Sequence, residues 1–382
     1  MDKLLDRLGR EAGLPDARRQ AWLGVVSGAR RGPGAAAARA GLSLLAALYR
    51  VGLAAREALL HLGGAPERVC PPVVSVGNLT VGGTGKTPMV ALLARLAADL
   101  GAQVAVVTRG YKAAAGERGD EALELERLLP GVAILQGKDR ARAIRQWTRD
   151  HPCDLVILDD GFQYRRLHRD LDIVLVDALE PFGFGHVLPR GLLREPLCAL
   201  ERADLVVLTR ADLVNGERVE AIRREVRRRA APDTPVLASR HRPSAVVLAD
   251  GSRASPESLR GSAVAAACGI GRPDAFRRTL EGLGAGVALW RTFPDHHAYA
   301  ASDVADLLAE TQAAGLKTLV TTGKDYVKWG RLIEPEAGAT RVGGLEYAVG
   351  VAALEVELEL LERTDAVRQR LADLLAVGAP RP

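Results

Sequence analysis

The chain has 382 residues, 48% of them hydrophobic and 26% charged, and a formal net charge of +5. This composition is that of an ordinary globular protein, which excludes a disordered or fibrous chain, and the length favours two domains. The mild positive charge is compatible with an anionic substrate or an anionic membrane surface and requires neither. The four cysteines stand far apart, without C-x-x-C spacing or histidines at ligand spacing, which indicates reduced thiols in a cytoplasmic protein.

The N-terminal region changes character near residue 35. Residues 1–34 are polar and predict a helix and a loop, whereas residues 35–62 are rich in alanine and leucine. The apolar run within 40–55 is interrupted by Arg50 and is shorter than the roughly 20 residues that span a bilayer, and no secretory cleavage motif follows it. Leucines surrounded by arginines are typical of an amphipathic helix on a membrane surface, although a helix packed on the protein's own core explains the same pattern.

Residues 73–87 carry the first chemical signal. Residues 73–76 read as a buried strand, a glycine-rich turn follows to Gly85, and Lys86-Thr87 open a helix. This strand–loop–helix arrangement is typical of a phosphate-binding P-loop, in which backbone N–H groups surround a polyphosphate. Lys86 is then expected to reach the β- and γ-phosphates and the Thr87 hydroxyl to hold Mg²⁺. The usual first glycine of the motif is Thr80 here.

Strands and helices alternate regularly after this loop. The expected strands cover residues 104–108, 132–135, 155–158, 173–176 and 205–208. Such alternation predicts a P-loop NTPase-like α/β fold, with a parallel sheet, right-handed crossovers and helices on both faces. Because ligands of such sheets bind at the carboxyl ends of the strands, the P-loop, Arg109-Gly110-Tyr111 and Asp159-Asp160 should share one crevice.

Two strand ends bear on the nucleotide. Residues 155–160 are four apolar residues followed by two aspartates, a Walker B pattern in which one carboxylate can hold Mg²⁺ opposite Thr87. Thr209-Arg210-Ala211-Asp212 lies where a GTPase carries its guanine-reading Asn-Lys-x-Asp, but threonine and arginine replace asparagine and lysine. The stretch is therefore either a base reader or a turn with a helix cap. Val81 stands where the partitioning and metal-insertion ATPases carry a second P-loop lysine, which argues against that class.

The pattern changes near residues 232–262. Four prolines and Asp250-Gly251 predict a linker that contains a hairpin. A second, smaller α/β unit is expected to follow, with strands at 263–270, 318–322 and about 345–354, helices at 273–283 and 302–314, and a C-terminal helix from Asp365. We therefore expect an N-terminal region (1–62), a nucleotide-binding domain (63–235), a linker (236–262) and a C-terminal domain (263–382).

Asp120, His296 and the pair Arg194-Glu195 indicate a catalytic function only when they are considered together. Gly119-Asp120-Glu121 begins a helix and taken alone is a cap, and His296 taken alone is a loop histidine. An aspartate oriented by a histidine could instead take a proton from an attacking alcohol, as a kinase requires. Arg194-Glu195, after a glycine-rich loop, offers an arginine for phosphate and a glutamate for a hydroxyl or a metal.

The whole set resembles the tetraacyldisaccharide 4′-kinase family of lipid A biosynthesis. The matching motifs occur in the family's order and cover roughly residues 40–330. They are SVGNLTVGGTGKTP at 75–88, TRGY at 108–111, GDE at 119–121, LDDGFQ at 158–163, PRGLLREP at 189–196, FPDH at 293–296 and TTGKD at 321–325. The threonine at position 80 is the family's own pattern. Gly323 departs from it, because the family usually carries glutamate there.

The resemblance implies a phosphotransferase that uses ATP and Mg²⁺. The acceptor is the 4′-hydroxyl of a tetraacyl-glucosamine disaccharide 1-phosphate, and the product is a lipid A precursor (lipid IVA). The enzyme is expected at the cytoplasmic face of the bacterial inner membrane, as a peripheral protein that binds no nucleic acid and needs no obligate protein partner. Two alternatives stay open: a P-loop GTPase or metallochaperone-like switch, and a non-catalytic nucleotide sensor at the membrane.

Residue roles follow from the matching motifs. Asp120 is the expected general base, tuned by His296, while Lys86 and Arg194 stabilise phosphate charge. The resemblance assigns Thr87, Asp159, Asp160 and Glu195 to the metal, and Tyr111, Glu121 and Arg140 to the substrate. It assigns to the nucleotide Asn78, Thr80, Val81, Gly82, Gly83, Thr84, Gly85, Lys86, Thr87 and Gln163.

Overall fold

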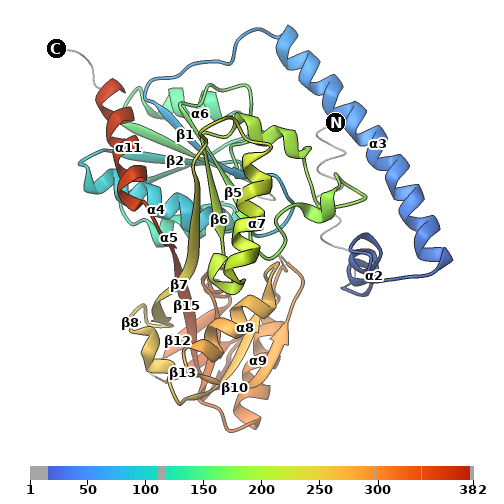
Figure 1. Ribbon diagram of the computed structural model, residues 1–382. Coiled ribbons are helices and arrows are strands. Elements are labelled where there is room, and N and C mark those ends of the chain that lie inside the picture. The colour runs from blue at the N-terminus through green and yellow to red at the C-terminus, as the bar shows by residue number, and fades with distance from the viewer. Residues whose placement is uncertain (1–15, 111–117, 296, 337, 379–382) are drawn as a thin grey trace. The chain divides into compact units, whose positions relative to one another are not determined.

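A computed structural model describes residues 16–110, 118–295, 297–336 and 338–378. This part of the chain divides into two units (Figure 1). The first unit contains the residues up to His241 and those from Leu358 onward, and the second contains Arg242–Glu357. Strands β7 (Val236–Leu248) and β15 (Gly350–Leu360) cross these boundaries, so the chain enters and leaves the second unit through two strands.

The centre of the first unit is a parallel sheet with the strand order β7-β6-β5-β1-β4-β2-β3. Strand β1 lies between β4 and β5, so the direction in which the chain winds reverses beside it, which is where ligands of such sheets bind. Besides β7, the strands are β1 (Val73–Asn78), β2 (Val104–Thr108), β3 (Ala133–Gln136), β4 (Leu155–Asp159), β5 (Leu171–Asp177) and β6 (Leu205–Thr209).

Helices cover both faces of this sheet, because its strands are apolar on both sides. Ile173 and Leu175 pack with α4 (Lys86–Asp99), α5 (Asp120–Leu128) and α11 (Thr364–Gly378). Val174 and Val176 point the other way and pack with α7 (Gly216–Arg227), while α6 (Arg140–Trp147) covers β2 and β4 on that same face. The alternation along β5 thus fixes two cores and leaves the carboxyl ends of the strands for the site.

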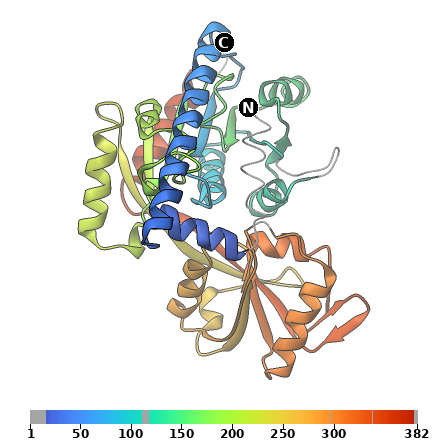
Figure 2. The ribbon, with the colours of Figure 1, turned by 90° about the vertical axis from the view of Figure 1, so that its right-hand side faces the viewer.

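The first unit also carries two N-terminal helices, α2 (Asp16–Val26) and α3 (Pro33–Leu62), the latter the long blue helix of Figure 2. Within the described residues, α3 is long and apolar enough to cross a membrane by its length and composition, and only 6% of its apolar 18-residue window is buried. The sequence had predicted a run too short for a span. The helix is longer than that run because the alanines before it and Arg50 within it continue the helical backbone.

The second unit contains a parallel arrangement in the order β10-β9-β11-β15. Helices α8 (Pro273–Gly282) and α9 (Ala301–Ala313) belong to separate cores of this unit, and α10 (Gly323–Trp329) follows β11. The other strands of the unit are β8 (Arg253–Ala254), β9 (Ala263–Cys268), β10 (Gly286–Thr292), β11 (Thr318–Thr322), β12 (Ile333–Glu336), β13 (Ala339–Val342) and β14 (Leu345–Tyr347).

The unit boundaries differ from the expected ranges of 63–235, 236–262 and 263–382. Residues 236–248 form one strand that begins by pairing Val236–Ala238 with β6 and continues into the second unit, and the expected hairpin occurs between β7 and β8. The C-terminal helix α11 belongs to the first unit because Val367 and Leu371 pack into its core beside α4. The sequence marks these residues as apolar and does not say which core they join.

Candidate active site

The P-loop begins where β1 ends and is held on its entry side by the segment around Leu192. The Asn78 side chain donates to the Thr80 carbonyl (2.8 Å), and the Val81 N–H donates to the Leu192 carbonyl (2.8 Å). Thr80 pairs with Leu193 as a β-bridge and is buried. A bridged residue with φ below zero needs no glycine, which explains the threonine at this position.

The exit of the loop requires glycine. Gly82 and Gly85 have φ angles of +110° and +91°. A Cβ on Gly85 would lie 2.6 Å from Nε2 of His241, so the loop and the side chain beneath it are closely fitted. Thr84 is buried with its hydroxyl unpartnered, and Thr87 follows Lys86 in the first turn of α4. The exposed N-terminus of α4 and these backbone N–H groups form a cradle for an anion.

Lys86 lies between the P-loop and the end of β4. Its Nζ is 3.5 Å from Oδ1 of Asn78 and 3.5 Å from Oδ1 of Asp160. The register that pairs Val76 with Asp159 carries both aspartates to the loop, as the strand-end rule predicted. Asp160 has a φ of +52°, which turns its side chain out of the strand alternation toward Lys86.

Asp160 is the anionic centre of a cationic cluster. Arg194 donates to both carboxylate oxygens at 2.8 and 3.0 Å, and Arg140 donates to the Asp160 carbonyl (3.1 Å). Although burial favours the neutral acid, Arg194 and Lys86 outweigh it and hold the pKa of Asp160 well below its usual range. Arg140 is buried and also lies 5.1 Å over the Tyr164 ring, so it supports Asp160 from behind.

Asp159 has the opposite environment. Its Oδ1 is buried without a hydrogen-bond partner, and burial together with the nearby Glu121 raises its pKa to about 7. An unpartnered buried carboxylate oxygen is costly and is what a hard cation would satisfy. Glu195, the third carboxylate predicted to hold the metal, pairs with Arg202 at 2.6 Å. Within the described residues, no three acidic, histidine or cysteine side chains gather in a metal-binding group.

Asp120 and Glu121 open helix α5, as the sequence predicted. The side chain of Gln136, at the end of β3, accepts a hydrogen bond from Gly119 N–H (2.9 Å) and lies where a Cβ on Gly110 would clash at 2.5 Å. Gln136 thus holds Gly119, the residue before Asp120, close to Gly110. Sequence reasoning missed Gln136, because a polar residue at a strand end has no spacing signature.

Two predicted site residues, Tyr111 and His296, lie outside the described residues. The motifs beside position 296 do meet within the second unit. Lys324 contacts Asp295 (3.0 Å), and Asp325 accepts hydrogen bonds from Gly269 N–H (2.9 Å) and the Thr322 hydroxyl (2.7 Å). Gly323 is the first residue of α10, so its φ and its lack of a side chain do not interrupt this network.

Helix α3 contacts the same site region from outside. The Tyr49 hydroxyl donates to the Arg194 carbonyl (2.9 Å), and Arg56 donates to the Gln163 carbonyl (2.9 Å). The Gln163 amide in turn donates to the Asn78 carbonyl (2.9 Å) at the start of the P-loop. Gln163 therefore connects α3 to the P-loop backbone. The sequence motifs marked Gln163 and Asn78 and did not mark Arg56.

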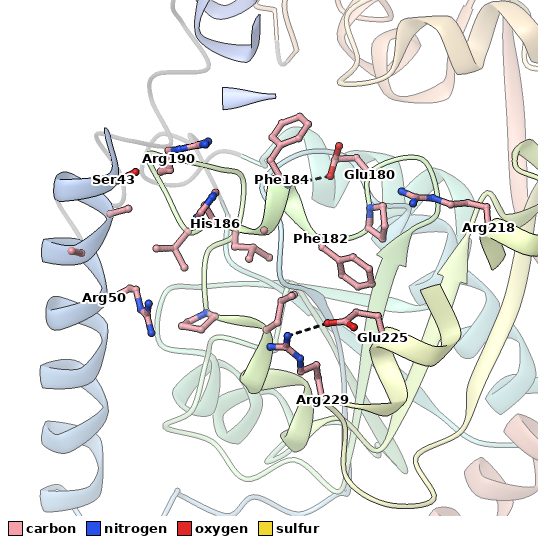
Figure 3. A pocket seen from close by; sticks show the side chains of 18 residues that line it. Ser43, Arg50, Glu180, Phe182, Phe184, His186, Arg190, Arg218, Glu225 and Arg229 are labelled. Atoms are coloured by element: carbon pink, nitrogen blue, oxygen red, sulfur yellow. Dashed lines mark hydrogen bonds and ion pairs between the residues drawn. The ribbon is translucent and has the colours of Figure 1, made fainter. Parts of the chain in front are cut away.

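A cavity of about 730 Å³ opens between α3, the loop before Arg194 and α7 (Figure 3). Arg50 points into it from α3, and Arg229 lies across from it, ion-paired with Glu225 (3.0 Å). Phe182 and Phe184 supply apolar wall. Two more arginines, Arg190 and Arg218, complete a lining that is both basic and apolar.

The family model described as tetraacyldisaccharide-1-P 4'-kinase matches residues 38–376 of the chain. The chain is 44% identical over 374 residues to a tetraacyldisaccharide 4'-kinase of Anaeromyxobacter sp. (strain K), covering 92% of this chain and 95% of that protein. It is 42% identical over 315 residues to the enzyme of the same name from Geobacter metallireducens, covering 76% of this chain and 90% of that protein.

Among solved structures, the chain is similar to LpxK from Aquifex aeolicus, crystallised in complex with ATP. The sequences are 29% identical, the TM-score is 0.67, and the match covers 88% of this chain and 99% of the other. The predicted α/β fold is therefore confirmed, and the similarity extends over both units.

Proposed function

Because the chain belongs to the tetraacyldisaccharide-1-P 4'-kinase family, we propose that it transfers the γ-phosphate of ATP to the 4′-hydroxyl of a tetraacyl-glucosamine disaccharide 1-phosphate. The observation that carries this proposal is the cradle at the P-loop, where Lys86 and Arg194 both lie against Asp160. Two cations beside an anion-binding loop suit the γ-phosphate, on which charge develops during transfer. The guanine-reading alternative is not favoured, because Arg210 is paired with Asp177 rather than open to a base.

We propose that Asp159 and the Thr87 hydroxyl hold Mg²⁺. The fit rests on the buried, unpartnered Oδ1 of Asp159, an oxygen of the kind that Mg²⁺ prefers. When bound, Mg²⁺ neutralises charge on the phosphates. Asp160 then has a separate task, since its ion pairs keep Lys86 and Arg194 in place before the nucleotide arrives.

Asp120 is the proposed general base. It begins α5 directly before Glu121, whose charge raises the pKa of Asp159, so this helix start lies at the carboxylate cluster. A carboxylate there can accept the proton of the sugar hydroxyl as the phosphoryl group is transferred. The bond to the ADP oxygen breaks as the bond from the sugar oxygen to phosphorus forms.

The test is transfer of a radiolabelled γ-phosphate from ATP to a disaccharide 1-phosphate lipid in detergent micelles with Mg²⁺. We expect labelled lipid with wild-type protein, none after chelation of Mg²⁺, and at least about 100-fold slower turnover for Asp120→Ala. Asp274→Ala is the matched control, because Asp274 also lies in the first turn of a helix, α8, and is exposed. Equal turnover in Asp120→Ala would exclude the base, and a wild type that binds ATP without labelling lipid would favour a nucleotide sensor.

We also propose that α3 lies on the cytoplasmic face of the inner membrane. An apolar stripe with helical spacing faces solvent, while Tyr49 and Arg56 contact Arg194 and Gln163 in the rest of the first unit. These contacts extend over two turns, which suits a helix lying along the surface better than one crossing it. The exposed fractions of the stripe are 67% for Leu44, 62% for Leu48, 67% for Val51, 67% for Leu59 and 84% for Leu62.

The cavity beside α3 supports the same proposal. Its arginines and phenylalanines combine the charge and the apolar surface that a phosphorylated lipid needs. Co-sedimentation with vesicles that contain anionic phospholipid provides the test. The double variant Leu44→Asp, Leu48→Asp should lose vesicle binding and keep ATP binding, whereas Leu345→Asp, at an exposed leucine of the second unit, should change neither. Unchanged vesicle binding of the double variant would contradict a surface role for the stripe.

A further inference from the structure

The stretch Thr209-Arg210-Ala211-Asp212 has no role in the proposed reaction. Its position after β6 suggested a base reader, yet its arginine is not directed toward solvent. Arg210 has a φ of +55°, a conformation that residues other than glycine rarely adopt and that clusters at functional sites. Only 9% of the residue is exposed. The backbone turn therefore carries the guanidinium inward, toward β5 and the P-loop.

The guanidinium of Arg210 joins two elements. One terminal nitrogen pairs with Oδ2 of Asp177 at 2.8 Å, and the other donates to the Gly83 carbonyl at 3.1 Å. Asp177 is the last residue of β5, is 3% exposed, and lies opposite Thr209 in the sheet. The pair thus connects the sheet to the middle of the P-loop. A planar fork with donors in fixed directions is what such a bridge requires.

The contact with Gly83 constrains the direction of a neighbouring N–H group. A peptide group is planar and trans, so the carbonyl of Gly83 and the N–H of Thr84 point in opposite directions. Gly82 and Gly83 have no side chains, and a Cβ on either would meet nothing within 4 Å, so on the Gly83 side no side chain helps to orient this peptide. A donor that holds the Gly83 carbonyl from outside therefore turns the Thr84 N–H toward the inside of the loop.

We propose that Arg210, oriented by Asp177, is a positioning residue for nucleotide phosphate, acting through the Gly83–Thr84 peptide. The inference rests on the proposed binding of ATP at this loop. Asp177 has two effects: it fixes the guanidinium in one orientation, and it balances a charge that is largely removed from water. Arg210 therefore acts on the nucleotide through the backbone of the loop and reads no base.

The test is calorimetric binding of ATP and of GTP, without lipid, to wild type, Arg210→Met, Arg210→Lys and Asp177→Asn. We expect Arg210→Met to weaken ATP binding by about tenfold, comparable with the loss of one hydrogen bond to a charged group, and Arg210→Lys by less. Since the phosphates are common to both nucleotides, GTP binding should weaken by the same factor. Arg240→Met is the control, because it also removes an arginine that pairs with a carboxylate, Glu359, and the hydrogen bonds of this arginine go to Glu359.

Kinetics give a second readout that a purely structural residue would not change selectively. The KM for ATP should rise in Arg210→Met and Asp177→Asn, while the KM for the lipid stays as in wild type. Unchanged ATP affinity in folded Arg210→Met would overturn the proposal, and so would a changed ratio of ATP to GTP affinity, which would restore the base reader. If Arg210→Met does not fold, Arg210→Lys decides, because lysine keeps the charge beside Asp177 and cannot hold both partners. Binding needs no lipid, so failure of the kinase assay leaves this test intact.

Discussion

Two arginine–carboxylate pairs flank the P-loop, and they differ in exposure. Asp160–Arg194 and Asp177–Arg210 have the same N–O distance of 2.8 Å, and each contains a residue with positive φ at the end of a strand. The side chains of the first pair are 26% and 27% exposed, whereas those of the second are 3% and 10% exposed. The Asp160–Arg194 pair is therefore partly exposed to solvent and is called the open pair below. The Asp177–Arg210 pair is buried and is called the closed pair.

The difference in exposure indicates whether an incoming ligand can replace a partner in each pair. Asp160 also contacts Lys86, so an incoming phosphate can compete with it for both cations, and the open pair can rearrange during the reaction. The Asp177–Arg210 pair has little access to water, and its second nitrogen holds backbone rather than a replaceable group. Removing one member of a buried pair costs about 3–5 kcal/mol, because the other charge is left unpaired. The open pair should therefore govern turnover, and the closed pair stability and affinity.

The largest expected effect is on turnover in Arg194→Met. Loss of one cation that stabilises developing phosphate charge should lower kcat by about 100- to 1000-fold. The thermal unfolding midpoint should change little, because Asp160 keeps Lys86 and partial solvent contact. Steady-state kinetics and thermal unfolding on the same preparation test both parts.

Asp177→Asn gives the contrasting case. Its unfolding midpoint should fall more than that of Arg194→Met, and its kcat at saturating ATP should fall less. The comparison fails if the two variants exchange these properties, that is, if the closed pair controls kcat and the open pair controls unfolding. Arg194→Lys sharpens it, since one nitrogen of Arg194 makes both contacts with Asp160 and an ammonium can restore the charge and these contacts, so this variant should recover part of the kcat lost in Arg194→Met.

The sequence was sufficient to predict the side of the P-loop on which Lys86 and Asp160 lie. A strand followed by Gly-Lys-Thr, and an apolar run followed by two aspartates, each predict where a parallel strand ends, and the register of β1 with β4 then brings Lys86 and Asp160 together. Strand ends share one edge of a parallel sheet, so this part follows from periodicity and motif spacing alone. The resemblance predicts that Arg194 stabilises phosphate charge, but it does not predict that Arg194 contacts Asp160.

The side of the P-loop that contacts Arg210 and His241 could not be predicted in the same way. Nothing in the local sequence indicates that Arg210 adopts a positive φ, because that conformation is imposed by tertiary contacts with Asp177 and Gly83. His241, which lies against Gly85, is likewise far from the P-loop in the sequence, because strands β2 to β6 come between them. The same holds for α11, whose apolar residues fit either core by pattern and join the first by packing.

The smallest predicted effect is a pH dependence of stability that arises on the side of the P-loop that contacts Arg210 and His241. Burial, and then the charge of Arg210, lower the pKa of His241 to about 3. The unfolded chain binds a proton at this residue below about pH 6.5, and the folded chain does so only near pH 3. Stability from the neutral imidazole is therefore fully present above pH 6.5 and decreases as the pH falls toward 3, by at most about 1.4 kcal/mol for each pH unit.

His241→Gln should remove this pH-dependent contribution to the free energy of unfolding. Urea unfolding at pH 7.5 and pH 5.5 should give wild type a loss of about 1 kcal/mol that the variant does not share. His241→Asn, a second neutral replacement of different length, separates the titration from packing against Gly85, since both variants should lose the pH dependence whatever their stability at pH 7.5. An equal loss in wild type and both variants would mean that His241 is accessible to protons in the folded chain. The loop would then be open on both sides, and the contrast between the two arginine pairs would not hold.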